Sequence, residues 1–298
     1  MQSTAQGFKL IKKIKDDRFD EENLHQYHLL VQLGVRDFQV AVIDSTDNRI
    51  LFFEDYVLGD LNSHEELLAQ IKVLFDSHPV LQAGFWKDVR VSIKNTKFVQ
   101  VPAPLFVAEA AAEYLQFNAH LDSTREDILI CKQASLLVTT VFAIQKDLHA
   151  WLLELYKNTH LYIVHQSAAL IEGVLEAAKN STRKPLYIYV DRFKLHILYV
   201  EQGKLIYYNQ FLIKQFSDYV KYIMLVLKSL AMDQNTSEVI LWGYIGKNSP
   251  HYQEFIKYVR NVKFGGRPSV LTFGYLFDEV QEHHFLDLYS IHLLHPVP

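Results

Sequence analysis

The sequence has very little cysteine, and this bounds both the chemistry and the setting of the protein. Only one cysteine, Cys131, occurs in 298 residues. No intramolecular disulfide can therefore form, and a reducing compartment is the natural setting. Because Cys131 lies in the apolar run ILICKQASLLV, we expect a buried structural thiol rather than a nucleophile.

A long hydrophobic segment is also missing. The longest uncharged apolar run covers thirteen residues, 133–145, and contains two threonines, which is too short to cross a bilayer. The first residues, MQSTAQGFKLIKKIKDD, include no continuous apolar stretch of the kind found in secretory signals. We therefore expect a cytoplasmic protein without membrane insertion.

Charge of one sign is not in excess either. The chain has 30 basic and 34 acidic residues and a formal net charge of -4, so the whole molecule offers no electrostatic reason to bind nucleic acid. Residues 1–23 interleave lysines with acidic residues, which favours a solvated edge strand or arm. With 49% hydrophobic and 21% charged residues, the composition is typical of a globular protein.

What the sequence does contain is a pattern that occurs twice, at 29–58 and 186–213. Each copy has an apolar strand, a short polar turn and two more strands joined by a second turn. In the first copy apolar residues alternate through Phe38, Val40 and Val42, and the second copy shows the same alternation. A period of two, bounded by Gly, Asn and Asp, predicts half-buried antiparallel strands.

Helices and further strands follow each copy. Ser63 and Glu66 have the spacing of a helix capping box. Further strands are expected at 89–93, 98–101, 128–132, 136–142, 161–164, 238–242 and 270–273. Helices are expected at 107–118, 145–156, 167–178, 217–232, from 250 and at 281–294.

The most loop-like stretch, 179–185, lies immediately before the second copy. We therefore expect a first lobe over 1–180 and a second over 181–298, with the terminal helix able to pack back on the first lobe. Two lobes, each with a sheet flanked by helices, form a mixed α/β architecture.

A duplicated three-strand unit followed by helices and further strands resembles the actin-like ATPase fold, which is ribonuclease H-like. More closely, YHLLVQLGVRDFQVAVID, VPAPLFVAEAAAEYLQFN and HHFLDLYSIHLL resemble an uncharacterised bacterial family known as domain of unknown function 3822, found chiefly in Bacteroidetes. The likeness covers 27–294 and implies a duplicated, two-lobed fold without an assigned activity.

In actin-like families the turn after the first strand of each repeat clamps phosphates, and a glycine-containing turn late in the second lobe contacts adenosine. The resemblance gives 32–37 as the first turn here. An Asp near that turn usually helps to hold the metal, but this chain has Gln32, a poor metal anchor. Gly34 remains, which suits a tight turn of N–H groups, and Asp37 could reach inward.

The second turn follows Asp191. From Asp191 to the matching strand residue Leu195 is four positions, against six in the first turn, so we expect it to be two residues shorter. It has no glycine and offers Arg192, Phe193 and Lys194. A minimal hairpin that replaced an unneeded loop is one interpretation, and contact with an anion through the basic side chains is the other.

The third turn, 243–250, includes Gly243, Gly246 and Ser249, which is expected to cap a helix that begins at Pro250. Free N–H groups and the positive end of a helix dipole would face a ligand there. A plain capped helix entry and an adenine contact both fit this pattern.

Two histidine arrangements were weighed as reactive sites. The adjacent His283 and His284 would point about 100° apart on a helix, and no HExxH or CxxC motif supports a metal site. His165 and Ser167 lie at a strand end, where residues so close in sequence rarely face each other. We therefore expect Ser167 to be a helix N-cap rather than a nucleophile.

Phosphoryl transfer depends on positioned phosphate and metal contacts, and two of the three expected turns are altered. The preferred interpretation is a non-catalytic protein with degenerate phosphate loops and no cofactor, which acts in protein–protein interaction or scaffolding. The alternative is a divergent ATP-binding switch, ATPase or phosphotransferase that uses ATP with Mg in the cleft between the lobes. Its cofactor-binding residues would be Gln32, Gly34, Asp37, Asp191, Gly243, Gly246 and Ser249.

Overall fold

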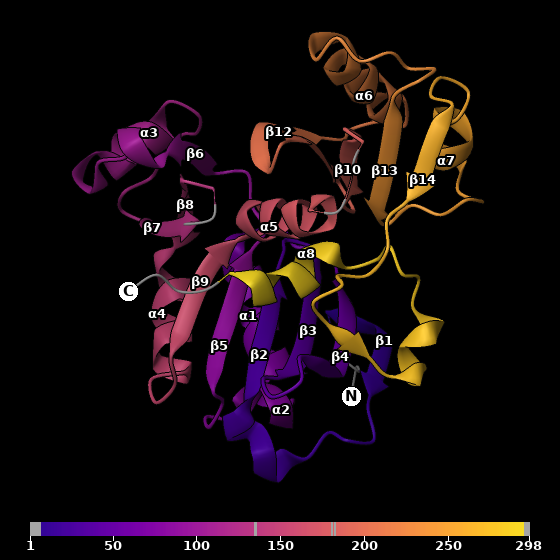
Figure 1. Ribbon diagram of the computed structural model, residues 1–298. Helices are drawn as coiled ribbons and strands as arrows, with labels where there is room; N and C mark the ends of the chain where they lie inside the picture. Colours follow the sequence, from indigo (N-terminus) through magenta and orange to yellow (C-terminus); the bar gives the residue numbers. More distant parts are fainter. Residues whose placement is uncertain (1–6, 134–135, 180, 182, 295–298) are drawn as a thin grey trace. The chain divides into compact units, whose positions relative to one another are not determined.

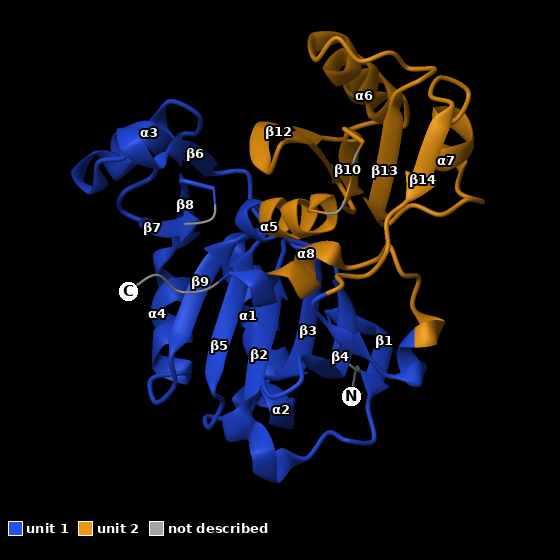
Figure 2. Ribbon diagram, viewed as in Figure 1, with its two compact units in different colours: residues 1–169, 270–277, 291–298 blue, residues 170–269, 278–290 orange. Residues whose placement is uncertain are grey.

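The computed structural model describes residues 7–133, 136–179, 181 and 183–294. The chain forms two compact units (Figure 2). Unit 1 draws on 1–169, 270–277 and 291–298, and unit 2 comprises 170–269 and 278–290. Compact units and sequence repeats are different divisions of a chain, so the boundary predicted at 180/181 stays a prediction.

The main sheet of unit 1 contains the first sequence repeat. Its strands run in the order β1-β4-β3-β2-β5-β9, and β15 also pairs with β4 (Figure 1). The bounds are β1 (Phe8–Lys15), β2 (Tyr27–Leu33), β3 (Asp37–Asp44), β4 (Arg49–Leu58), β5 (Asp88–Ile93), β9 (Leu161–His165) and β15 (Thr272–Phe273). The repeat β2-β3-β4 is antiparallel, and β5 continues it in parallel with β2. The basic segment near the N-terminus forms the edge strand β1, as predicted.

Three helices accompany this sheet: α1 (His64–Asp76), α2 (Pro79–Gln82) and α4 (Lys146–Leu155), and a 3-10 helix, η1 (Glu21–Gln26), precedes β2. The predicted capping of α1 is confirmed, because the backbone N–H of Glu66 donates to Ser63 Oγ at 3.2 Å. The Glu66 carboxylate in turn accepts from the backbone N–H of Asn62 at 2.8 Å. Both ends of the first turn are thereby satisfied.

A three-stranded sheet in unit 1 has the order β6-β8-β7. Its strands are β6 (Phe98–Pro102), β7 (Glu126–Gln133) and β8 (Val138–Gln145). The helix predicted over 107–118 is wrong in extent: two 3-10 turns, η2 (Ala103–Leu105) and η3 (Ala108–Ala110), precede a short α3 (Ala111–Gln116). No side chain caps η3 or α3, so this segment lacks the contact that would start a longer helix. Cys131 on β7 is buried, as predicted.

Unit 2 contains the second repeat and has the strand order β12-β11-β10-β13-β14. The strands are β10 (Leu186–Val190), β11 (Lys194–Glu201), β12 (Lys204–Leu212), β13 (Glu238–Gly243) and β14 (Asn261–Phe264). As in the first repeat, three antiparallel strands are continued by a parallel strand on the first of them. The duplication read from the sequence is therefore present in the strand pairing.

The helices of unit 2 are α6 (Ser217–Ser229), α7 (Pro250–Phe255) and α8 (Leu286–Tyr289), while α5 (Gln166–Ala178) passes from unit 1 into unit 2. The single terminal helix predicted over 281–294 is wrong. Phe285 has a left-handed φ of 60°, which no helix interior accommodates. Only α8 and a 3-10 turn, η5 (Ser290–Leu293), follow it, and η4 (Tyr275–Glu279) comes before it.

Two other predicted elements are shorter than expected. The strand expected at 270–273 is reduced to β15, and the helix expected at 217–232 ends at Ser229, because Ala231 adopts a left-handed φ of 53°. The last described residues belong to unit 1, where Arg90 donates to the carbonyl oxygen of His292 at 2.8 Å. In the described part of the chain no helix combines the length and apolarity needed to cross a bilayer.

A buried carboxylate, Glu54 on β4, joins three elements of unit 1. Its oxygens lie 2.5 Å from His78 Nε2 and 2.8 Å from Lys13 Nζ, and they accept from the Tyr56 hydroxyl at 2.6 Å. Burial alone would raise the pKa of Glu54, but the hydrogen bonds from His78, Lys13 and Tyr56 outweigh it and hold the pKa below its usual range. The ionised form is therefore the stabilising one.

We expect the stability contributed by Glu54 to be present above its unfolded pKa of about 4.3 and lost as the pH falls through the lower folded pKa. Glu54→Gln should reduce the free energy of unfolding at pH 7 by about 2 to 3 kcal/mol and flatten its acid dependence. Urea unfolding between pH 3 and 7 measures both. Glu21→Gln, which removes an exposed partner of Lys15, is the matched control and should change neither.

Candidate functional site

The first turn joins β2 to β3. Leu33 pairs with Phe38, and the backbone N–H of Gly34 donates to the carbonyl oxygen of Asp37 at 2.9 Å, so only two residues form the bend. A Cβ at Gly34 would lie 2.0 Å from Asp37 Oδ1. A side chain at this position would displace the Asp37 carboxylate, which folds back over the turn.

Buried polar side chains fill the space beside this turn. Asp37 Oδ2 accepts from Lys94 Nζ at 2.5 Å and from Gln39 Nε2 at 3.2 Å. Gln39 also donates to Asp55 Oδ1 at 2.9 Å and accepts from Gln32 Nε2 at 3.4 Å. All five side chains are buried. The three predicted residues of the first turn thus lie together, and the Lys94 ammonium forms an ion pair with Asp37.

The second turn, between β10 and β11, has the same closure as the first. Val190 pairs with Leu195, and the backbone N–H of Asp191 donates to the carbonyl oxygen of Lys194 at 2.9 Å. The prediction that this turn is two residues shorter is therefore wrong. The sequence comparison matches Gln32 with Asp191, whereas the strand register makes Gln32 the counterpart of Tyr189.

By the same register Asp191 occupies the position of Gly34. Asp191 is buried, and its Oδ1 accepts the backbone N–H of Arg192 at 2.8 Å. The Arg192 guanidinium lies 4.3 Å from the centre of the Tyr244 ring, within range of a cation–π interaction. Arg192 therefore lies against the third predicted turn rather than extending freely from the hairpin.

The third turn starts at the end of β13. Gly243 has a φ of 90°, and a Cβ there would lie 2.1 Å from the carbonyl oxygen of Val190. The backbone N–H of Tyr244 donates to that same oxygen at 2.7 Å, and the N–H of Gly243 donates to the carbonyl oxygen of His283 at 2.8 Å. Only glycine combines this backbone conformation with such close approach.

The predicted N-cap is confirmed, because Ser249 Oγ accepts from the backbone N–H of Tyr252 at 3.2 Å and Pro250 is the first helical residue. The helix α7 that it caps is only six residues long. A dipole summed over so few peptide groups is small, so the capped helix entry is the simpler interpretation of Ser249.

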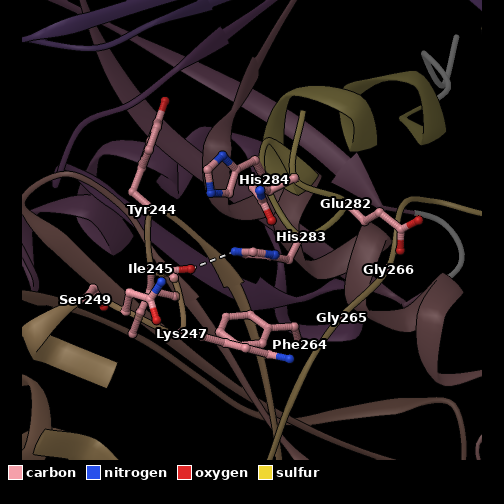
Figure 3. Close-up of a pocket in the computed structure, with 13 residues that line it drawn as sticks. Tyr244, Ile245, Lys247, Ser249, Phe264, Gly265, Gly266, Glu282, His283 and His284 are labelled. Carbon is pink, nitrogen blue, oxygen red and sulfur yellow. Dashed lines mark hydrogen bonds between the residues drawn. The ribbon is translucent and has the colours of Figure 1, made fainter. Parts of the chain in front are cut away.

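Gly246 and Ser249 open onto a pocket of about 780 Å³ in unit 2 (Figure 3). The loop after β14 and the segment before α8 form the rest of its wall. The lining residues outside the predicted third turn are Phe264, Gly265, Gly266, Gln281, Glu282, His283 and His284. The pocket thus combines two glycine-containing turns with aromatic rings.

A model of the family described as "Protein of unknown function (DUF3822)" matches residues 16–262, more than half of the chain. The chain belongs to this family. No curated protein matched the sequence.

Solved structures show the fold of this DUF3822 chain. It is similar to a Bacteroides thetaiotaomicron protein described as having an actin-like ATPase fold and unknown function, with 22% identity and a TM-score of 0.75, over 92% of this chain and 98% of that one. It is also similar to a chain of the PilM-PilN type IV pilus biogenesis complex, with 11% identity and a TM-score of 0.63, over 90% and 99%. The fold is the actin-like ATPase fold.

His283 and His284 of the DUF3822 chain lie in the pocket wall and not on a helix, contrary to expectation. Burial lowers the pKa of His283, and the hydrogen bond from its Nε2–H to the carbonyl oxygen of Ile245 at 2.6 Å opposes this only in part (Figure 3). Burial and the neighbouring His283 ring lower the pKa of His284 to about 4. Both rings are therefore neutral at pH 7.

The pocket wall outside the third turn was missed because its parts lie far from that turn in sequence. β13 and β14 pair in parallel, with Leu241 facing Phe264, so the turns after the two strands meet at one edge of the sheet. A glycine-containing turn after each of two neighbouring parallel strands is the signal that could have located it. In the DUF3822 chain these turns are 243–246 and 265–266.

The rejected pair of His165 and Ser167 is present. His165 Nδ1 lies 2.7 Å from Ser167 Oγ, and α5 begins at Gln166, so Ser167 lies inside the helix and is not its N-cap. Both residues are fully buried, and the Phe98 ring stacks on the imidazole with centres 4.4 Å apart. No substrate can reach this pair without local opening. Among the described residues, no group of three His, Cys, Asp or Glu side chains could hold a metal ion.

The close approach at Gly243 makes a specific prediction. Gly243→Ala should lower the free energy of unfolding by more than about 2 kcal/mol, because the new Cβ meets the Val190 carbonyl at a φ that alanine disfavours. Gly246→Ala is the matched control, since a Cβ there meets no atom within 4 Å. Equal unfolding midpoints for the two variants would contradict this account of the turn.

Proposed function

We propose that this chain is a non-catalytic protein of the actin-like fold that acts by binding a protein partner in the cytoplasm. The observation that carries the proposal is the ion pair between Lys94 and Asp37. Its charged atoms are 2.5 Å apart, and both side chains are almost fully buried. A carboxylate held by a lysine in this way is a poor ligand for Mg²⁺, which requires ionised oxygens that it can share with water and phosphate.

The strand register supports the same proposal. Gln32 occupies the position at which the actin-like resemblance leads us to expect a metal-holding carboxylate, and the strand register makes Tyr189 its counterpart in the second repeat. The Gln32 side chain is a neutral amide. The Tyr189 hydroxyl supplies no anionic oxygen at neutral pH, because burial and the nearby Asp287 carboxylate raise its pKa well above its usual value. The residues present do not fit an Mg-ATP clamp of the usual kind.

Exposed apolar side chains support the proposal that the chain binds another protein. Phe117, Leu105 and Leu137 are 86%, 67% and 66% exposed, and all three lie in segments that belong to the small sheet of unit 1 or flank it. Strongly exposed apolar side chains of this kind can contribute to contact with another protein. The similarity to a chain of the PilM-PilN complex is consistent with this role.

A second candidate function is a nucleotide-binding switch that uses the pocket beside Gly246. Within the described residues, no hydrogen bond occupies the backbone N–H of Gly246, Lys247 or Asn248. Such groups suit an anion or a hydrogen-bonding base. This candidate keeps Gly246 and Ser249 as ligand contacts and requires no metal at Asp37.

Thermal unfolding with millimolar Mg-ATP separates the two functions. If the chain is non-catalytic and binds no nucleotide, its melting temperature should not change, because a ligand stabilises only by binding the folded state. A rise of about 2 °C or more that Gly246→Trp abolishes would support the second candidate and overturn the first. Mg-GTP at the same concentration is the control for binding that does not depend on the base.

The Lys94–Asp37 pair can be tested by itself. Lys94→Met leaves a buried carboxylate without its counter-charge and should cost about 3 to 5 kcal/mol of unfolding free energy. Lys94→Met combined with Asp37→Asn removes both charges and should recover most of the loss. A cost below about 1 kcal/mol for the single variant, measured by urea unfolding, would show that Asp37 does not depend on Lys94.

A further inference from the structure

A pocket of about 540 Å³ lies on unit 2 beside α6, well away in sequence from the glycine turns (α6 in Figure 1). Met224, Leu225 and Met232 line it together with Lys221 and Lys228. The whole chain has three methionines, and two of them line this one pocket. Methionine side chains are flexible and polarizable, which suits a surface that accommodates an apolar partner.

The core of unit 2 uses only part of this side of α6: Met224 and Met232 pack against the core while they line the pocket. Ile223, Val226 and Leu227 are buried against the sheet, whereas Leu225 is 56% exposed. Residues spaced by three or four positions share one face of a helix. Lys221, Leu225 and Lys228 have this spacing and form a second stripe, apolar at its centre and basic at both ends.

The end of α6 directs Met232 back to the same pocket. The backbone N–H of Met232 donates to the carbonyl oxygen of Leu227 at 2.9 Å, and that of Ala231 donates to Lys228 at 3.2 Å. This is a Schellman motif, in which Ala231 takes the left-handed position that usually belongs to glycine. Left-handed backbone is unfavourable for alanine, so the turn is held by its surroundings.

Lys221 has an acidic neighbour on α6, because it helps to lower the pKa of Asp218 three positions earlier, but the two residues form no ion pair. Neither Lys221 nor Lys228 forms an ion pair with any residue that the structure describes. Seven residues of helix separate them, a rise of about 10 Å. A complementary partner therefore presents two acidic groups about 10 Å apart with apolar side chains between them.

We propose that the α6 pocket, formed by Lys221, Met224, Leu225, Lys228 and Met232, docks an acidic amphipathic helix of the protein partner. The proposal rests on the proposed function and names the chemistry of its partner. A helix with acidic residues two turns apart and apolar residues between matches both the spacing of the lysines and the exposed Leu225. The surface is hollowed, so projecting side chains fill it better than the flat face of an anionic bilayer does.

Site-specific cross-linking of the full chain in its native cells tests the docking. A benzophenone amino acid replaces Leu225 or, as a matched control, Leu153, a leucine of α4 that is 51% exposed. We expect a protein adduct at position 225 and not at 153, and mass spectrometry should find the cross-linked segment in an acidic amphipathic helix. Adducts with lipid, with a second copy of this chain or with a basic segment overturn the proposal, as does the absence of an adduct.

Binding of the cross-linked segment, as a fluorescein-labelled synthetic peptide, measures the contributions of charge and apolar contact. Leu225→Glu, and separately Lys221→Glu with Lys228→Glu, should each weaken binding to the full chain by about tenfold or more. Leu153→Glu should leave the affinity unchanged. Unaltered melting temperatures establish that the variants are folded, as expected for exposed positions.

Failure of this inference is distinguishable from failure of the proposed function. A partner that is captured by the full chain and binds Leu225→Glu as tightly as the original chain overturns the α6 pocket but leaves the partner-binding function intact. A chain that captures no protein at either position and is stabilised by Mg-ATP contradicts the proposed function itself.

Discussion

Both units depend on how the first two strands of each repeat pair, and the hydrogen-bonded register of this pairing is the same in both. Leu33 faces Phe38 and Val190 faces Leu195, so in each case a two-residue turn is all that sheet pairing leaves room for. The backbone path of the two turns is therefore the same. Their side chains decide what each turn can do, and these differ: the first has a glycine and a carboxylate paired with Lys94, and the second has a buried Asp191 and an arginine stacked on Tyr244.

Several buried charges in unit 1 have a close partner of opposite charge. Asp37 is paired with Lys94, Glu54 with His78, and Asp88 with both His28 and Arg90. Removing an ion from water is costly unless another charge or several hydrogen bonds replace the lost hydration. At the first turn this pairing engages Asp37 and Lys94 with each other.

The helices α1 and α6 differ in their end contacts and in how much of their surface is buried. α1 begins with reciprocal side-chain caps and buries a single stripe that includes Leu68, Ile71 and Leu74. α6 has no side-chain cap at its start, ends in a left-handed alanine and leaves a second stripe in solvent beside the buried one. Unfavourable backbone that persists at the edge of a surface pocket is a pattern found at binding sites.

The sequence by itself determined the features that depend on neighbouring residues. Strand alternation, the Ser63 and Ser249 caps, the exposed basic edge strand and the duplicated order of strands all follow from local patterns. The fold and the candidate residues of the three turns were within reach for this reason. The true end of the chain could not be predicted in this way. The periodicity of 281–294 indicated one helix and gave no sign that Phe285 has a left-handed backbone.

Only the tertiary structure decided which distant residues meet. Parallel pairing of β13 with β14 brings 243–246 beside 265–266, and packing places Lys94 on Asp37, 57 positions away. It also set the register that makes Tyr189, and not Asp191, the counterpart of Gln32. Such contacts depend on strand order and burial, which local sequence patterns do not encode, so the content of the turns was predictable but their partners were not.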